Sequence, residues 1–291
     1  MDHKKPQRNP REGALVVLNA TLPLAALWLL LLTTRAMAAS EAPAASPQFL
    51  AGIEYQYGNR YAADGNYEQA IRYYRRSLAI HPSWEVFNRL GIVYMEIESY
   101  PEAFRAFHAA VRIHPRNPEL HYHLGFAQEQ AGDLDAAADA CRESLRLDPP
   151  QPAVQQALGE VLHELGEYRE VIAAFAEAAR LQPGNAKHRV SLGISQSNLL
   201  QHESALFELE AAAKLDPGDE RGAVWLGRAY IGAQRPVEAV AADERAVWLA
   251  PARAANHFAL GGACLASEQW EPASVAFLRA LELQPDYDEA A

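Results

Sequence analysis

Residues 118–151 read PELHYHLGFAQEQAGDLDAAADACRESLRLDPPQ, and this pattern recurs along most of the chain. If the copies are numbered so that Gly125 is position 8, a glycine recurs at this position every 34 residues, except for a first interval of 33, at Gly58, Gly91, Gly125, Gly159, Gly193, Gly227 and Gly261. A proline at position 32 keeps the same interval, from Pro82 to Pro285. A period of this length indicates a solenoid, in which one supersecondary unit stacks on copies of itself. The sequence therefore predicts a protein that recognises a partner along an extended surface.

Each unit carries the pattern of two amphipathic helices separated by a break. Positions 8, 20 and 27 hold small residues in nearly every unit, which lets the two helices approach closely, and a bulky residue at position 24 fills the space beside them. Gly65, Gly132 and Gly166 fit left-handed ends of first helices, and the proline at position 32 ends each second helix. Position 24 departs from the pattern at Cys141 and Asp243, so we expect looser packing around the sixth unit.

This pattern resembles the tetratricopeptide repeat, which has leucine at position 7, glycine at 8, alanine at 20 and 27, an aromatic residue at 24 and proline at 32. The resemblance implies a right-handed α-solenoid of seven antiparallel helix pairs. The units expected from it are 51–83, 84–117, 118–151, 152–185, 186–219, 220–253 and 254–287, followed by a tail at 288–291.

The first 38 residues differ from the repeats. Basic residues precede an uncharged run from Gly13 to Thr34, and Ala36-Met37-Ala38 follows it. This order is typical of a secretory signal peptide, although the run is also long enough for an uncleaved membrane anchor. Residues 39–50 read as a linker. Either interpretation places the repeats outside the cytoplasm, and the absence of an N-x-S/T sequon in residues 39–291 favours a bacterial periplasm.

Charge narrows the class of partner. Without residues 1–38 the chain keeps 21 basic and 35 acidic residues, a net charge of −14. Nucleic-acid binding requires a cationic surface, so we expect a protein or peptide partner and no nucleic acid, with membrane contact only through an uncleaved N-terminal segment. The last helix carries Val275, Leu278 and Leu281 beside a short tail, which indicates a further association site, although such a helix can also simply fray.

The resemblance also implies where a partner binds, because first helices line the concave groove of such solenoids. Ten residues are carried over as the predicted partner-binding groove: Asn59, Asn88, Tyr122, Phe126, Glu129, Glu160, Val190, Ile194, Arg228 and Phe258. The N-terminal half of this set is acidic with aromatic and amide members. Ordinary alternatives exist, since surface glutamates are often merely solvated and Tyr122 and Phe126 can instead pack against the next unit.

No catalytic or metal-binding motif stands out, and we expect no cofactor. A carboxylate pair such as Glu129 and Glu160 is the one catalytic alternative, and it lacks an enclosing pocket. The sequence therefore favours a non-enzymatic, exported scaffold in a cell-envelope assembly. An accessory subunit that positions an envelope enzyme, such as a glycosyltransferase or hydrolase, is the other class of function that fits.

Overall fold

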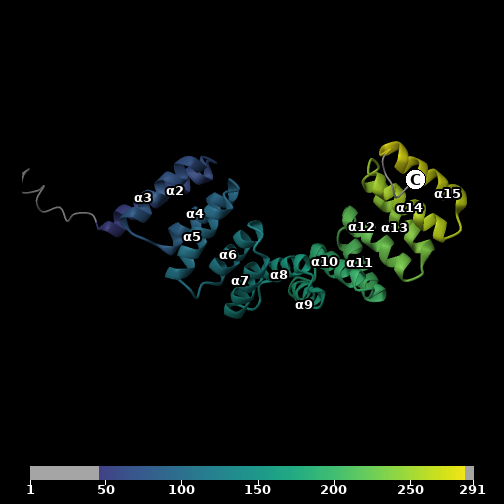
Figure 1. Cartoon of the computed structure of the whole chain (residues 1–291), viewed down its shortest axis with the longest axis horizontal. Coiled ribbons are helices and arrows are strands. Elements are labelled where there is room, and N and C mark those ends of the chain that lie inside the picture. Colours follow the sequence, from purple (N-terminus) through teal and green to yellow (C-terminus); the bar gives the residue numbers. More distant parts are fainter. Residues whose placement is uncertain (1–45, 286–291) are drawn as a thin grey trace, which may run out of the picture. The chain divides into compact units, whose positions relative to one another are not determined.

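The computed structural model describes residues 46–285, and this part of the chain forms fourteen α-helices and no strand (Figure 1). The helices are α2 Pro47–Ala63, α3 Tyr67–Ile80, α4 Trp84–Glu96, α5 Tyr100–Ile113, α6 Pro118–Gln130, α7 Leu134–Leu147, α8 Pro152–Leu165, α9 Tyr168–Leu181, α10 Ala186–Asn198, α11 His202–Leu215, α12 Glu220–Gly232, α13 Pro236–Leu249, α14 Ala254–Ala266 and α15 Trp270–Leu283. The predicted signal peptide or anchor and the predicted tail lie outside the described residues.

Consecutive helices pair, and each pair packs on the next along the chain from α2/α3 to α14/α15. The predicted α-solenoid of seven helix pairs is confirmed. One boundary differs: α2 begins at Pro47, inside the segment predicted to be a linker, because proline suits the first turn of a helix. Among residues 46–285, no helix combines the length and the apolar character needed to cross a bilayer.

Short polar side chains begin several helices. The side chains of Asn66, Asn117, Asp133, Asn185 and Asp219 accept hydrogen bonds from backbone N–H groups in the first turns of α3, α6, α7, α10 and α12. Proline occupies the first turn of α5, α6, α8 and α13, where its missing N–H breaks no helical hydrogen bond. These residues mark the break inside a unit at α3, α5, α7 and α13, and the start of a new unit at α6, α8, α10 and α12.

Position 15 of each unit has a left-handed backbone. The predicted left-handed glycines are confirmed, with φ of 72° at Gly65, 81° at Gly132 and 79° at Gly166. The other four units place Glu98, Leu200, Gln234 and Glu268 there, with φ between 57° and 61°. A side chain in this region clashes with the following carbonyl. The repeat geometry therefore imposes the conformation even where the sequence disfavours it.

Leu200→Gly is expected to stabilise the protein. Leu200 is 76% exposed, so little packing is lost, and relief of its left-handed strain exceeds the entropic cost of glycine by roughly 0.5–1 kcal/mol. The reciprocal change Gly132→Ala, where an added Cβ meets nothing within 4 Å, should destabilise by about 1 kcal/mol. Urea denaturation measures both. A Leu200→Gly variant less stable than the wild type would contradict this account.

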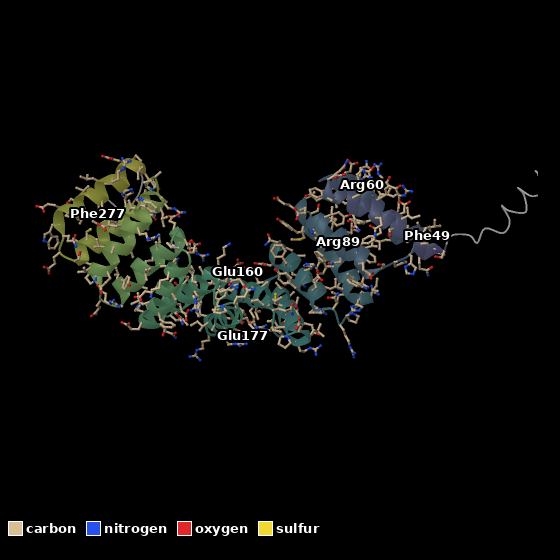
Figure 2. The ribbon with its side chains drawn as sticks, turned by 180° about the vertical axis from the view of Figure 1, so that it is seen from behind. Phe49, Arg60, Arg89, Glu160, Glu177 and Phe277 are labelled. Carbon is tan, nitrogen blue, oxygen red and sulfur yellow. The ribbon has the colours of Figure 1, made fainter. Side chains whose placement is uncertain are left out.

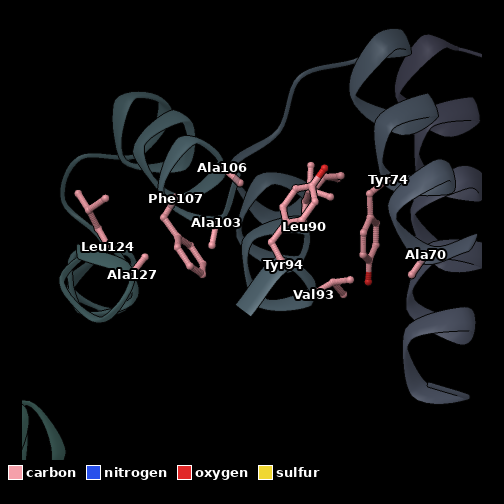
Figure 3. Close-up of a cluster of buried hydrophobic side chains, with 11 residues drawn as sticks. Ala70, Tyr74, Leu90, Val93, Tyr94, Ala103, Ala106, Phe107, Leu124 and Ala127 are labelled. Carbon is pink, nitrogen blue, oxygen red and sulfur yellow. The ribbon is translucent and has the colours of Figure 1, made fainter. Parts of the chain in front are cut away.

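The core is a chain of clusters between neighbouring helices rather than one central body. Figure 3 shows the first, in which the large side chains of Tyr74, Leu90 and Phe107 lie with alanines contributed by successive units. A Cβ added at Gly91 would lie 2.5 Å from the ring of Phe107, and one at Gly193 would lie 2.6 Å from Leu209. The predicted fit of a small residue at position 8 against a bulky one at position 24 is therefore confirmed.

Candidate functional site

The most exposed part of the predicted groove lies on α6 and α8. Phe126 on α6 is 42% exposed, and it shares a helix face with Tyr122 and Glu129, because residues three and four apart are neighbours on a helix. Glu160 and Glu164 lie exposed on α8. Figure 2 shows Glu160 and the outer residue Glu177 on opposite sides of the α8/α9 pair. We call Tyr122, Phe126, Glu129, Glu160 and Glu164 the acidic–aromatic surface.

The carboxylates of this surface repel one another. The pKa of Glu129 is raised, first by burial of its half-exposed side chain and then by the negative charges of Glu160 and Glu164. Glu160 accepts one hydrogen bond, from Gln156 Nε2 to its Oε1 at 2.8 Å. No basic side chain is among the causes of the Glu129 pKa shift. A cation placed here would therefore be attracted by several uncompensated charges.

Tyr122 is partly engaged in packing. Its ring lies against the apolar cluster that contains Cys141 and Leu158, as the alternative interpretation of this residue requires. Burial raises the pKa of its phenol, and the negative charges of Glu160 and Glu129 raise it further. Tyr122 therefore supports the base of the surface, while Phe126 is its exposed aromatic member.

The two predicted asparagines are held by neighbouring side chains. Asn59 Oδ1 accepts a hydrogen bond from the Tyr74 hydroxyl at 2.9 Å. Asn88 is buried, and its Oδ1 lies 2.8 Å from Nδ1 of His123 on the next first helix. Burial lowers the pKa of His123, which favours the neutral ring that donates to Asn88. Asn88 thus joins two units and offers little surface to a ligand.

The predicted groove residues of the C-terminal half differ in exposure. Val190 and Ile194 are buried in the apolar cluster between α10, α11 and α12. Arg228 lies over the ring of Trp225, with its guanidinium carbon 4.9 Å from the ring centre. Phe258 packs with its ring centre 5.5 Å from that of Phe277. Arg228 is exposed on α12, whereas the exposed predicted residues Phe126 and Glu160 lie on the neighbouring first helices α6 and α8.

A polar network that was not predicted from the sequence links α8 to α10. Gln156 Oε1 lies 2.9 Å from His188 Nδ1, and Gln156 Nε2 donates to Ser191 Oγ at 3.1 Å. His188 Nε2 also lies 3.0 Å from Asn185 Nδ2. The signal available was His188, a polar residue at a repeat position that holds an apolar residue in the four preceding units. Gln156 Nε2 also donates a hydrogen bond to Glu160 Oε1, so the network orients one carboxylate of the acidic–aromatic surface.

Metal chemistry has little support in this part of the molecule. Within residues 46–285, no group of three or more His, Cys, Asp and Glu side chains is arranged to hold a metal ion. Cys141 and Cys264 are both buried free thiols, and burial raises the pKa of Cys141 to about 12. These thiols stay protonated and pack as small apolar side chains.

The fold and its exposed first-helix surface define an α-solenoid of the kind that binds other proteins. Models of the tetratricopeptide repeat family match residues 55–118, 88–152 and 152–185. The chain therefore contains tetratricopeptide repeats, and such repeats generally mediate protein–protein interactions. Assignment of the last three helix pairs to the same family stays a prediction. No curated protein matches the chain.

Solved structures share the fold. The tetratricopeptide repeat protein YrrB, described as having an unusual peptide-binding site, is 22% identical, covers 64% of this chain and 95% of its own, and has a TM-score of 0.58. PilF of Pseudomonas aeruginosa is 18% identical over 71% of this chain and 94% of its own, with a TM-score of 0.60. The C-terminal part of a repeat protein from Cytophaga hutchinsonii is 18% identical over 81% and 97%, with a TM-score of 0.67. At these identities the likeness concerns the fold alone.

Proposed function

We propose that this protein is a non-enzymatic scaffold that binds an extended protein segment along its first helices. The observation that carries the proposal is the acidic–aromatic surface, where the exposed ring of Phe126 lies among carboxylates whose charges raise the pKa of Glu129. The side chain of Phe126 leaves 42% of its surface exposed beside uncompensated charge, and an exposed ring next to carboxylates suits recognition of a peptide.

The chemistry of the surface selects the partner. A lysine or arginine side chain placed between Glu129 and Glu160 would relieve their mutual repulsion, and its alkyl stem would cover Phe126. We infer that the bound segment carries basic residues at this point. YrrB, which shares the fold, is described as having a peptide-binding site, and this supports a peptide as the ligand class.

We propose further that the protein is exported from the cytoplasm. The basic head, uncharged run and Ala36-Met37-Ala38 sequence support export, with the repeats acting in a bacterial cell-envelope assembly. The proposed role is then to hold an exported chain or another subunit of that assembly. If the protein is instead an accessory subunit of an envelope enzyme, it should form a stable complex of fixed stoichiometry with that enzyme.

Loss of the carboxylates is expected to abolish selection for basic peptides. The probes are two fluorescent peptides of equal length and hydrophobicity, one rich in lysine and arginine and one rich in glutamate. Fluorescence anisotropy with the full chain should show binding of the basic peptide only. Glu129→Gln combined with Glu160→Gln should weaken that binding by about tenfold or more, since charged contacts at interfaces are worth 1–2 kcal/mol or more each.

The matched control is Glu143→Gln combined with Glu177→Gln, which makes the same change in net charge on the second helices α7 and α9. This control variant should bind the basic peptide as the wild type does, apart from a small general electrostatic effect. Equal losses in the two double variants would mean that overall charge, and not the acidic–aromatic surface, attracts the peptide. Binding of the acidic peptide with equal affinity would also contradict the proposal.

A further inference from the structure

The first helix of the solenoid exposes a face that the other first helices bury. Position 3 is buried in the six later units, at Val86, Leu120, Val154, His188, Gly222 and Asn256, but Ile53 on α2 is 39% exposed. At position 7, the second to fifth units have a buried leucine, at Leu90, Leu124, Leu158 and Leu192. The first unit has Tyr57 there, which is 48% exposed. Ile53, Gln56, Tyr57 and Arg60 line one hollow on α2. We call these four residues the α2 end face.

In the interior units this face is covered by the preceding unit. Asn256 on α14 donates to the backbone carbonyl of Ala246 on α13, at 3.0 Å. A Cβ added at Gly222 on α12 would lie 3.3 Å from Val190 on α10. Position 3 therefore marks the side of a first helix on which a preceding unit packs. On α2, Tyr57 stacks on Tyr73 of its own unit, and the described residues contain no preceding unit that covers Ile53.

The last helix has the complementary feature. At position 25, second helices contact the following unit through polar groups: Arg75 Nη2 donates to the Tyr94 hydroxyl at 2.7 Å, and the Tyr230 hydroxyl donates to Glu210 Oε1 at 2.8 Å. In α15 this position holds Leu278, which is 61% exposed. Position 17 also faces the following unit, because the ring of His202 lies beside Gly232 of the next first helix.

In α15 position 17 is Trp270, which is 63% exposed. Leu278 and Trp270, the α15 end face, are thus apolar at two positions that contact a following unit elsewhere. The described residues contain no such unit. Inside the chain, positions 17, 25 and 27 of a second helix contact positions 13, 11 and 3 of the following first helix. The second-helix side of this recurring interface is therefore left open on α15, and the first-helix side, which includes Ile53, is left open on α2.

We propose that copies of this chain associate head to tail, with the α15 end face of one copy packed on the α2 end face of the next. A second copy is the occupant that continues an interface this molecule already forms between its own units. A symmetric pairing of α15 with α15 has no counterpart inside the chain. A head-to-tail contact is heterologous, so it leaves one end face open at each end and permits longer assemblies at higher concentration.

Thiol cross-linking between two single-cysteine additions tests this arrangement in the full chain. Ile53→Cys and Leu278→Cys variants carry different affinity tags and are treated with a short bis-maleimide, separately and as a mixture. The native Cys141 and Cys264 are buried. The mixture should give at least about tenfold more adduct between the two tagged chains than a control mixture of Ile53→Cys with Phe207→Cys. The reason is that a specific interface raises the local concentration of the two thiols.

Phe207 is the control because it is a large apolar residue at least as exposed as Leu278, 70% exposed on α11, away from both end faces. Adding Trp270→Glu to the Leu278→Cys chain should remove the adduct while leaving the far-UV circular dichroism unchanged. Adduct equal to that of the Phe207→Cys control would overturn the proposal. So would adduct from Leu278→Cys alone as strong as from the mixture, because that result would mean symmetric pairing.

Discussion

Phe107→Ala is expected to lower the free energy of unfolding by about 3–5 kcal/mol. The ring is 1% exposed. It packs against Gly91 of its own unit and lies 5.3 Å, between ring centres, from His123 of the next unit. Neither neighbour can fill the space left by the ring, because Gly91 has no side chain and His123 is hydrogen-bonded to Asn88. A cavity should therefore remain between α4, α5 and α6.

Urea denaturation followed by circular dichroism measures this loss, with Phe126→Ala as the control at an exposed phenylalanine. A solenoid is stabilised by nearest-neighbour contacts, so hydrogen exchange should accelerate most in α4, α5 and α6 and least in α12 to α15. If Phe107→Ala costs no more than Phe126→Ala, the account of the core as interlocked glycine and aromatic positions is wrong.

Asp243 is expected to make stability fall with rising pH. It occupies position 24, where other units place Tyr74, Phe107, Phe175, Leu209 or Phe277, and it is 3% exposed. Its Oδ1 is buried without a hydrogen-bond partner. Burial raises its pKa from 3.8 to about 7, although Arg228 on α12 acts in the opposite direction.

The direction of the effect follows from proton binding. Between pH 4 and 7 the folded state holds a proton on Asp243 that the unfolded state has released, so the free energy of unfolding decreases as pH rises. The pKa shift corresponds to a loss of about 4 kcal/mol in the free energy of unfolding between pH 4 and 7. Above pH 7 this contribution no longer changes with pH. Asp243→Asn cannot ionise, so the stability of this variant relative to the wild type should rise by that amount from pH 4 to pH 8.

Paired urea titrations of wild type and Asp243→Asn at several pH values measure the difference directly. Subtraction cancels the pH dependence that both proteins share, such as that of Glu220. Burial raises the pKa of Glu220, but hydrogen bonds from Arg253 and Asn256 and the charge of Arg253 together bring that pKa below its ordinary value. A difference independent of pH between 4 and 8 would contradict the burial of an unpaired carboxyl group at this position.

Much of the fold could be predicted because its information is local and periodic. The glycine at position 8 and the bulky residue at position 24 meet in the same unit, so their spacing alone predicts the contact that Gly91 and Phe107 make. The left-handed turn after the first helix was predicted only where glycine signals it. Glu98 and Leu200 adopt the same turn because the packing of the two helices dictates it.

The candidate site was less predictable because exposure depends on contacts between units. Val190 and Ile194 occupy groove positions by their number in the repeat, yet they pack inside a cluster. Asn88 and His123 lie in different units and form a hydrogen bond that no single-unit pattern encodes. Phe126 and Glu160, by contrast, are exposed, and they stay the predicted partner contacts.

Photo-crosslinking in cells tests the central claim, that the first-helix surface binds a protein partner. A photoreactive phenylalanine analogue replaces Phe126 in one variant and Arg142 in the control, where the side chain lies on α7 and pairs with Glu170 at 2.9 Å. Captured proteins are identified by mass spectrometry. We predict one dominant partner from position 126, cross-linked through a basic extended segment, and none from position 142. Equal capture from the two positions, or none from position 126, would contradict the claim.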